Sequence, residues 1–468
     1  MSIRMNHDDS RVQTGRLVKV SSMHEHVFTN YGDLASAAGR ALNNDPGSKF
    51  AGYSHYGKST FFQGAMLPSA ESKYNVTAFI YATAHVDFPL PFLIHGMSRE
   101  NSNFESNWMG YVAVSNDDYS KSIGRREICV VWRGTVRNFE WINDIADAGP
   151  VPADPLLPAG KGPKGLIGLI GSAINHPMIM EGWHIIYTTA NPNSKLVKTS
   201  ARTQLLAEVK DLLVKYKGEK ISITCAGHSL GASLATISAF DLAANVATPD
   251  IMVSAFVFAS PQVGNAAFKS KMEELPNLKV MSIKNVNDIV PKWPSKILEW
   301  VDQNTTLLFL PKDIPGVYVD VGIEVLVDTK RSPFLKEKGG LAIQHVADFH
   351  NLECTLHMVA GYDGKNSEFN WQSVEKRRGL GSVNMWGDLL KDKYQVPQSW
   401  WAEKHKGMVL NEKGEWTLSV VDLDDHDLSP STTPTRCVLS GPLVLEKRPL
   451  NAIIKAPIGY GSNCLMTF

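Results

Sequence analysis

The sequence lacks any apolar stretch long enough to cross a bilayer. Its longest apolar runs reach about ten residues, whereas a membrane-spanning helix needs roughly 20. Residues 1–17 contain no apolar segment of the kind that secretory signal peptides carry, and Asp8 and Asp9 argue against an organellar transit peptide. We therefore expect a protein that is not embedded in a membrane.

Cysteine is scarce, and neither sign of charge dominates. The 468 residues include five cysteines, none of them in a CxxC spacing, which predicts reduced thiols in a cytoplasmic protein and no zinc site. The 47 basic and 47 acidic side chains are interspersed along the chain. This balance favours neither a nucleic acid nor any other polyanion as a partner.

The most informative segment is 221–246, which has the pattern of a buried strand, a sharp turn and a helix. Apolar and polar residues alternate before the turn, and small residues follow it. At the turn, Gly227, Ser229 and Gly231 form a G-x-S-x-G motif, in which small neighbours are needed because the serine backbone is strained. The motif predicts that Ser229 is a catalytic nucleophile. The alternative is a serine in a purely structural turn.

Strand and helix patterns alternate on both sides of this motif. Such a rhythm predicts an α/β protein with right-handed crossovers. We expect an α/β-hydrolase fold, in which helices flank a mostly parallel central sheet and a lid-like insertion interrupts the chain. The expected strands are 75–87, 108–117, 128–132, 221–226, 251–259 and 279–284, and the expected helices include 27–41 and 199–216.

The composition divides the chain into three parts. We expect a flexible arm at 1–24, a hydrolase domain at 25–420 and a C-terminal extension of unknown role at 421–468. Within the domain, 149–180 begins with prolines and glycines and continues with the apolar run GLIGLIGSAI. A long apolar connection favours a lid that covers the serine and makes transient contact with a membrane surface. The alternative is a surface insertion folded onto the core.

Two backbone amides are candidates for an oxyanion hole. The apolar strand at 128–132 ends abruptly in Arg133, Gly134 and Thr135. In hydrolases of this architecture, one donor comes from such a loop and the other from the residue after the nucleophile. This assigns the amides of Thr135 and Leu230. Thr135 is equally suited to cap a following helix, and the two roles are compatible.

The remaining members of a catalytic triad should follow Ser229 in the order acid, then histidine. Asp288 directly follows the strand at 279–284 and fits the acid. Three histidines are candidates for the base: His345, His350 and His357. We favour His350, because a helix pattern begins near it and a catalytic histidine belongs on a loop, whereas His357 lies inside that helix.

Several long motifs, in the same order, resemble the plant class 3 lipase family and, more narrowly, its cytosolic phospholipase A1 type II members. The resemblance implies hydrolysis of glycerolipid acyl esters, chiefly at sn-1, without a metal or organic cofactor. It places catalysis on Ser229, Asp288 and His350. The motifs include GHSLGASLATISAFDLA, VVWRGTVRNFEWINDI, FASPQVGNAAFK, IKNVNDIVPKWP and FHNLECTLHMVAGY.

The chain departs from the family pattern in three places. It carries the GLIGLIG insert, has Thr355 where the family has an aromatic residue, and ends in a segment, 420–468, without a recognised counterpart. These departures bear on the choice of substrate more than on hydrolysis itself. Two alternatives to lipid hydrolysis also stay open. One is a specialised carboxylesterase or acyltransferase that uses the same triad. The other is a catalytically silent signalling module of lipase fold.

Overall fold

The chain divides into two compact units, Met1–Thr432 and Thr433–Phe468. The described residues all belong to the first unit. Most of the expected arm, the middle of 149–180 and the whole extension at 421–468 lie outside the described residues, and these boundaries stay predictions. The computed structural model describes residues 22–44, 48, 50–85, 104–135, 149–158, 176–294, 318–337, 345–361, 369–370, 372, 374, 378–401, 408–410 and 416–418.

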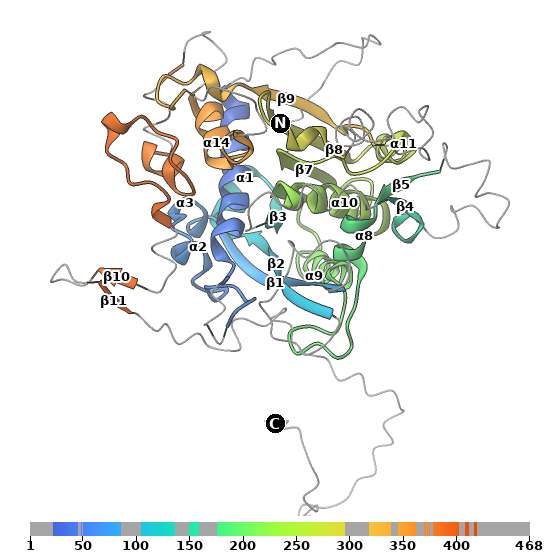
Figure 1. The fold of residues 1–468 in the computed structure, drawn as a ribbon. Coiled ribbons are helices and arrows are strands. Elements are labelled where there is room, and N and C mark those ends of the chain that lie inside the picture. The colour runs from blue at the N-terminus through green and yellow to red at the C-terminus, as the bar shows by residue number, and fades with distance from the viewer. Residues whose placement is uncertain are drawn as a thin grey trace, which may run out of the picture. The chain divides into compact units, whose positions relative to one another are not determined.

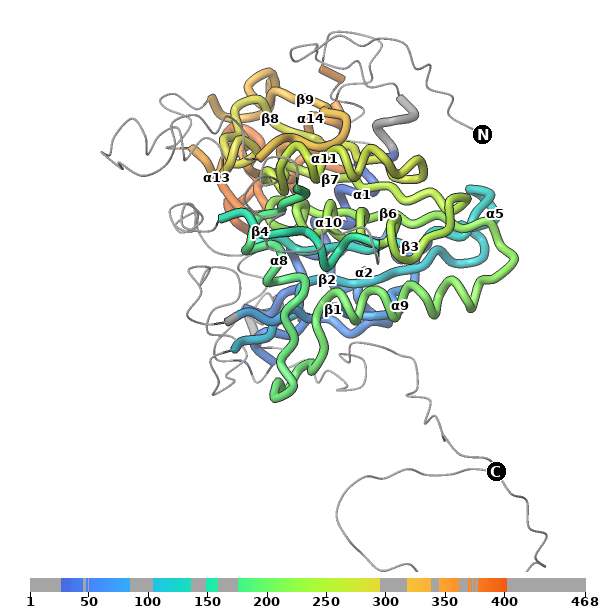
Figure 2. Tube along the Cα trace, turned by 90° about the vertical axis from the view of Figure 1, so that its right-hand side faces the viewer, coloured from blue at the N-terminus to red at the C-terminus, as the bar shows by residue number. Residues whose placement is uncertain are grey.

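A seven-stranded sheet runs through the first unit in the order β1-β2-β3-β6-β7-β8-β9 (Figure 2). Neighbours from β3 to β9 are parallel, whereas β2 is antiparallel to β1 and to β3 at one edge. The expected α/β-hydrolase class with a mostly parallel sheet is confirmed. The strands are β1 (Tyr74–His85), β2 (Phe104–Ser115), β3 (Arg126–Trp132), β6 (Ile221–His228), β7 (Met252–Phe258), β8 (Leu278–Asn285) and β9 (Ile323–Val327).

Helices cover both faces of this sheet (Figure 1). On one face, α8, α9 and α10 bury an apolar core against the strands, and on the other face α1 and α14 do the same. Every residue of β3 is buried, which explains the continuous apolar run at 128–132 that follows the charged residues at its start. The longer helices are α1 (Ser22–Ala41), α5 (Asp117–Ile123), α8 (Glu181–Thr188), α9 (Ala201–Lys215), α10 (Leu230–Asn245), α11 (Ala266–Glu273) and α14 (Leu352–Gly361).

Short elements complete the described part of the chain. In β4 and β5, which pair antiparallel, the two ends of the expected lid segment lie side by side. Residues 159–175 between them lie outside the described residues, so the lid stays a prediction. The short elements are α2 (Phe61–Gly64), α3 (Pro68–Glu71), α13 (Val346–Phe349), β4 (Pro150–Pro152), β5 (Met178–Met180), β10 (Met408–Leu410), β11 (Trp416–Leu418) and 3-10 turns at Asp154–Leu156, Val290–Lys292, Thr329–Arg331, Leu380–Asn384 and Asp392–Tyr394.

The crossover helix α9 begins where its sequence predicts. The Ser200 side chain accepts a hydrogen bond from the Thr203 N–H at 3.1 Å, as an N-cap residue does. Leu205, Val209 and Leu212 recur on one face of α9 and are buried in the core. The helix therefore packs on the sheet and returns the chain to the start of β6. No helix in the described part of the chain is long and apolar enough to cross a membrane.

Gly231 lets α10 pack directly on the end of β3. A Cβ atom at Gly231 would lie 2.4 Å from the carbonyl oxygen of Trp132 and 2.6 Å from that of Arg133. Because both are backbone atoms, Gly231→Ala should push α10 away and lower the free energy of unfolding by about 3 kcal/mol, measured by denaturant titration. Gly39→Ala is the control, since its Cβ would meet nothing within 4 Å. Equal losses in both variants would contradict this account.

Candidate active site

Ser229 lies in a sharp turn between β6 and α10. Its φ of 58° and ψ of −128° are values that residues other than glycine rarely adopt. The Ser229 N–H donates to the Phe258 carbonyl at 3.0 Å, which ties the turn to β7. The side chain is buried, and its Oγ has no hydrogen-bond partner among the described residues. The turn therefore holds a buried hydroxyl that forms no hydrogen bond with a described residue.

Gly227 makes room for this turn. A Cβ atom there would lie 2.2 Å from the carbonyl oxygen of Gly231 and 2.8 Å from the amide nitrogen of Ala232. Any side chain would therefore collide with the first turn of α10. The two glycines of the motif have the steric role that the sequence predicts for them, because each faces backbone that cannot move.

Asp288 and His350 are in direct contact. The His350 Nδ1 and Asp288 Oδ2 atoms are 2.7 Å apart, and both side chains are buried. The other carboxylate oxygen accepts the Val290 N–H at 2.9 Å. Because an ionised carboxylate only accepts hydrogen bonds, we assign the ring proton to Nδ1, which leaves Nε2 able to take a proton. His350 lies between α13 and α14, on the junction predicted for it.

His228 connects the histidine loop to the nucleophile turn. Its Nε2–H donates to the His350 carbonyl at 2.9 Å, and the two rings lie 4.7 Å apart between centroids. Desolvation and the neighbouring His350 lower the pKa of His228 well below its ordinary value, so the ring is neutral. Since His228 directly precedes Ser229, this contact brings the loop that carries His350 to the serine turn.

The two candidate oxyanion donors also belong to this turn. Leu230 is the first residue of α10, where backbone N–H groups have no partner within the helix. A Cβ atom at Gly134 would lie 3.5 Å from the Ser229 Cβ, so the loop after β3 borders the serine. Thr135 follows Gly134 and is the last described residue before position 149. The helix suggested after it lies outside the described residues, and oxyanion donation by Thr135 and Leu230 stays a prediction.

Arg133 is a buried residue of the site that sequence reasoning did not single out. Its guanidinium donates to the Trp108 carbonyl at 2.7 Å and to the Gly134 carbonyl at 2.8 Å. Burial lowers the pKa of Arg133 to about 9, which still leaves the group charged at neutral pH. The abrupt change from an apolar strand to arginine is the signal that could have identified it as a support for the oxyanion loop.

The other two candidate histidines have different partners. His345 Nδ1 lies 3.2 Å from an Asp348 carboxylate oxygen at the start of α13. His357 is buried inside α14, where its Nε2 lies 2.8 Å from the Ser332 Oγ. Of the three candidate histidines, His350 is therefore the one whose described contacts include Asp288.

The burial of His357 makes the stability of the fold depend on pH. Desolvation, followed by the charge of Arg378, lowers the His357 pKa from 6.5 to about 4. In the unfolded chain, His357 binds a proton more readily than in the folded protein. The neutral, buried His357 therefore makes its full contribution to the free energy of unfolding above pH 6.5, and this contribution is lost as the pH falls towards 4. Between pH 6.5 and pH 4, the free energy of unfolding of His357→Gln should fall by about 3 kcal/mol less than that of the wild type. Denaturant titration at several pH values measures this difference. An unchanged slope would contradict this prediction.

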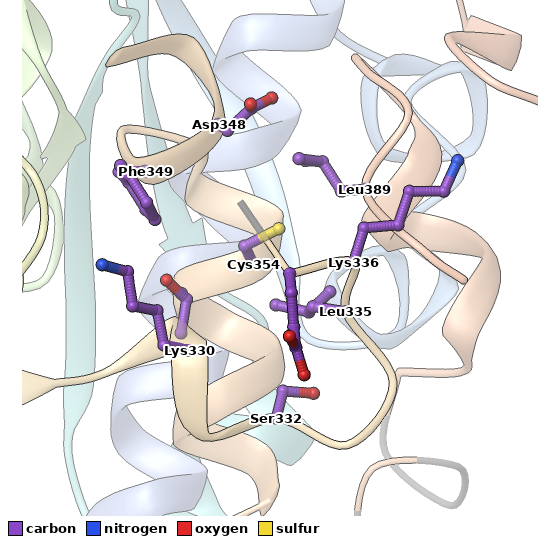
Figure 3. A pocket seen from close by; sticks show the side chains of 10 residues that line it. Lys330, Ser332, Leu335, Lys336, Asp348, Phe349, Cys354 and Leu389 are labelled. Carbon is purple, nitrogen blue, oxygen red and sulfur yellow. The ribbon is translucent and has the colours of Figure 1, made fainter. Parts of the chain in front are cut away.

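A cavity of about 260 Å³ lies behind the histidine loop (Figure 3). Asp348 and Phe349, the two residues before His350, form part of its wall, together with Lys330, Lys336 and Cys354. Neither Ser229 nor His350 lines this cavity. It is therefore separate from the reacting groups.

The described ranges contain no cluster of side chains suited to hold a metal ion. In those ranges no three His, Cys, Asp or Glu side chains cluster as metal ligands would. The described cysteines, Cys129, Cys225 and Cys354, are buried and form no disulfide with one another. That the enzyme needs neither a metal nor a cofactor stays a prediction.

Comparison with known proteins identifies the family. A model of the class 3 lipases matches residues 129–297. Phospholipase A1-IIdelta of Arabidopsis thaliana is 42% identical over 400 residues, which cover 84% of this chain and 90% of the relative. Phospholipase A1-II 5 of Oryza sativa subsp. indica is 38% identical over 392 residues, 83% of this chain and 76% of the relative. A Rhizomucor miehei lipase structure shares 16% identity at a TM-score of 0.39, over 69% of this chain and 78% of that one. The chain belongs to the class 3 lipase family and is similar to its phospholipase A1-II members.

Proposed function

We propose that this lipase-family enzyme hydrolyses glycerolipids at the sn-1 ester through an acyl-enzyme. The observation that carries the proposal is the buried Asp288–His350 pair, 2.7 Å apart, on a loop held beside the Ser229 turn. The relatives named phospholipase A1-II, which match most of this chain, support the substrate class. A complete acid, base and nucleophile set is what acyl transfer requires.

In the proposed mechanism, the Ser229 Oγ attacks the ester carbonyl while His350 Nε2 takes the hydroxyl proton. Asp288 holds the imidazole in the correct tautomer and stabilises the imidazolium without accepting its proton. The Leu230 and Thr135 amides stabilise the tetrahedral oxyanion. His350 then protonates the leaving alcohol, and water, activated by the same ring, releases the fatty acid and restores the serine.

The test is hydrolysis of p-nitrophenyl butyrate and of a mixed-chain phosphatidylcholine by the purified protein, with the released fatty acids identified by mass spectrometry. Serine-dependent release of the sn-1 chain is the expected result. Activity on the soluble ester alone would replace the proposal with a specialised esterase or an acyltransferase. Inactivity on both, without fluorophosphonate labelling of Ser229, would indicate a lipase-like signalling module.

We further propose that 149–180 is a lid that contacts lipid surfaces. The antiparallel pairing of β4 with β5 brings the two ends of this segment together, and the sequence between them contains the apolar run GLIGLIGSAI. Exposed apolar segments commonly mark lipid contact. Deleting 161–175 should lower activity on phospholipid vesicles about tenfold or more and leave hydrolysis of p-nitrophenyl butyrate unchanged, as expected if the segment binds the interface. Equal losses on both substrates would contradict the lid.

We also propose a cytoplasmic location. Free cysteines in the described residues, with Cys129 and Cys225 in neighbouring strands of the sheet, are typical of proteins in a reducing compartment. A tagged full-length chain should fractionate with cytosolic markers. Recovery of the chain in an organelle lumen or in the secreted fraction would contradict this location.

A further inference from the structure

Two consecutive backbone carbonyls of the histidine loop are held by side chains from two strand ends. The Nε2–H of His228, the last residue of β6, donates to the His350 carbonyl at 2.9 Å. The Nδ2–H of Asn285, the last residue of β8, donates to the Phe349 carbonyl at 2.9 Å. These strands also lead to the other two members of the triad, since Ser229 follows β6 directly and Asp288 lies three residues beyond β8.

The two donors are themselves held in place. Asn285 is buried, and its Nδ2 also donates to the Thr329 Oγ1 at 2.9 Å while its side-chain oxygen accepts the Asn287 N–H at 3.3 Å. The His228 ring packs against the His350 ring, with 4.7 Å between centroids. Its lowered pKa keeps it neutral, in the form that donates from Nε2 and carries no charge beside the base. Neither side chain can turn away without losing several contacts.

A catalytic histidine needs such support because its ring moves with the backbone from which it projects. Asp288 holds the His350 Nδ1, and the loop backbone sets where the ring as a whole lies. His350 stands between α13 and α14, at a break in the regular helical hydrogen bonding. A displacement of about 1 Å at a reacting group can cost on the order of 100-fold in rate. Fixing the two carbonyls fixes the peptide plane from which the ring projects.

We propose that His228 and Asn285 are positioning residues that clamp the His350 backbone to the ends of β6 and β8 and so align the base with Ser229 and Asp288. The inference rests on the proposed function, because it assigns the two side chains a part in the same hydrolysis. Neither residue exchanges a proton with the substrate. Each acts through the backbone of the base.

For His228, two substitutions separate the hydrogen bond from the ring contact. His228→Phe keeps a ring against His350 but removes the donor, whereas His228→Gln restores an N–H at similar reach. On p-nitrophenyl butyrate, we expect kcat of the phenylalanine variant to fall about 10- to 100-fold with KM unchanged, and the glutamine variant to recover most of this loss. Equal kcat values for the wild type and His228→Phe would overturn the role of His228.

For Asn285, the chain offers a matched control. Asn277 is likewise a buried asparagine with two hydrogen bonds from Nδ2, in its case to the backbone carbonyls of Thr248 and Ile251 at 3.4 and 3.1 Å. Asn285→Ala should lower kcat per folded molecule about 10- to 100-fold, while Asn277→Ala should keep the wild-type kcat. Both should lose stability, because each substitution removes two hydrogen bonds made by a buried amide. Equal kcat values for the two alanine variants would overturn the role of Asn285.

A proton NMR measurement separates failure of the clamp from failure of the proposed function. In the wild type, the Nδ1 proton shared between His350 and Asp288 should give a downfield resonance. His228→Phe and Asn285→Ala should broaden or shift it, and His228→Gln and Asn277→Ala should leave it in place. If the wild type shows no Ser229-dependent hydrolysis, the proposed function fails, but the resonance still tests the clamp. A resonance that is unchanged in both clamp variants would overturn it.

Discussion

Ser229→Ala should abolish ester hydrolysis, with kcat lowered by about 10⁶-fold on p-nitrophenyl butyrate. The reason is that the Ser229 Oγ is the atom that forms the acyl-enzyme, and loss of the nucleophile removes the function of the whole triad. The substitution deletes a buried hydroxyl that has no hydrogen-bond partner among the described residues. Its removal should therefore leave the free energy of unfolding nearly unchanged, which denaturant titration checks.

Ser233 supplies the control for this experiment. It lies one helical turn further along α10, is buried, and has an Oγ that likewise has no hydrogen-bond partner in the described part of the chain. Ser233→Ala removes the same hydroxyl group from the same helix. Because no described residue hydrogen-bonds to this hydroxyl, kcat should stay within about twofold of the wild type. Activity retained by Ser229→Ala, or lost to the same extent by Ser233→Ala, would contradict the assignment of the nucleophile.

The regular elements could be predicted because their signals are local. A continuous apolar run marks β3, which is covered on both faces, and a serine cap with a buried stripe marks α9. Boundaries were less accurate. The helix expected from 27 begins at Ser22. The helix expected near His350 is α14, which begins at Leu352, and a short segment before His350, α13, was not expected. A spacing of apolar residues does not reveal where one segment ends and the next begins, because both bury the same kind of side chain.

The candidate site was predictable where chemistry follows directly from chain order. Ser229 and Asp288 come just after strands, so their place at one edge of a parallel sheet follows from the strand pattern. The contacts of His228 and Asn285 could not be predicted in this way. They join residues 122 and 64 positions apart, and no local pattern specifies which carbonyl a side chain will meet. The IKNVNDIVPKWP motif identifies the aspartate but does not indicate what Asn285 contacts.

The same limit applies to charges inside the fold. Glu353, three residues after His350, is buried and forms ion pairs with Arg40 of α1 and with Arg378. Arg378 also pairs with Asp33 of α1. In the sequence, these four side chains look like ordinary surface charges on helices or loops. Only the packing of α1 against α14 shows that they balance one another away from water, where an unpaired charge would be costly.

Asp288→Asn and His350→Ala should each lower kcat by about 10⁴-fold or more on p-nitrophenyl butyrate, with little change in KM. The asparagine keeps the shape of the carboxylate but favours the wrong imidazole tautomer, and the alanine removes the base itself. Because the two residues act as one unit across a 2.7 Å contact, the double variant should be hardly slower than the worse single variant. Losses that multiply would mean that the two residues act independently.

His357→Ala tests whether His350, just before α14, or His357, inside α14, is the catalytic base. His357 pairs with Ser332 and is buried, so the variant should lose stability, but kcat per folded molecule should stay within about tenfold of the wild type since the Asp288–His350 pair is intact. The measurement is kcat beside the folded fraction from circular dichroism. If His357→Ala were as slow as His350→Ala while remaining folded, His357 would be the base, and Asp288 would have to change partners during the reaction.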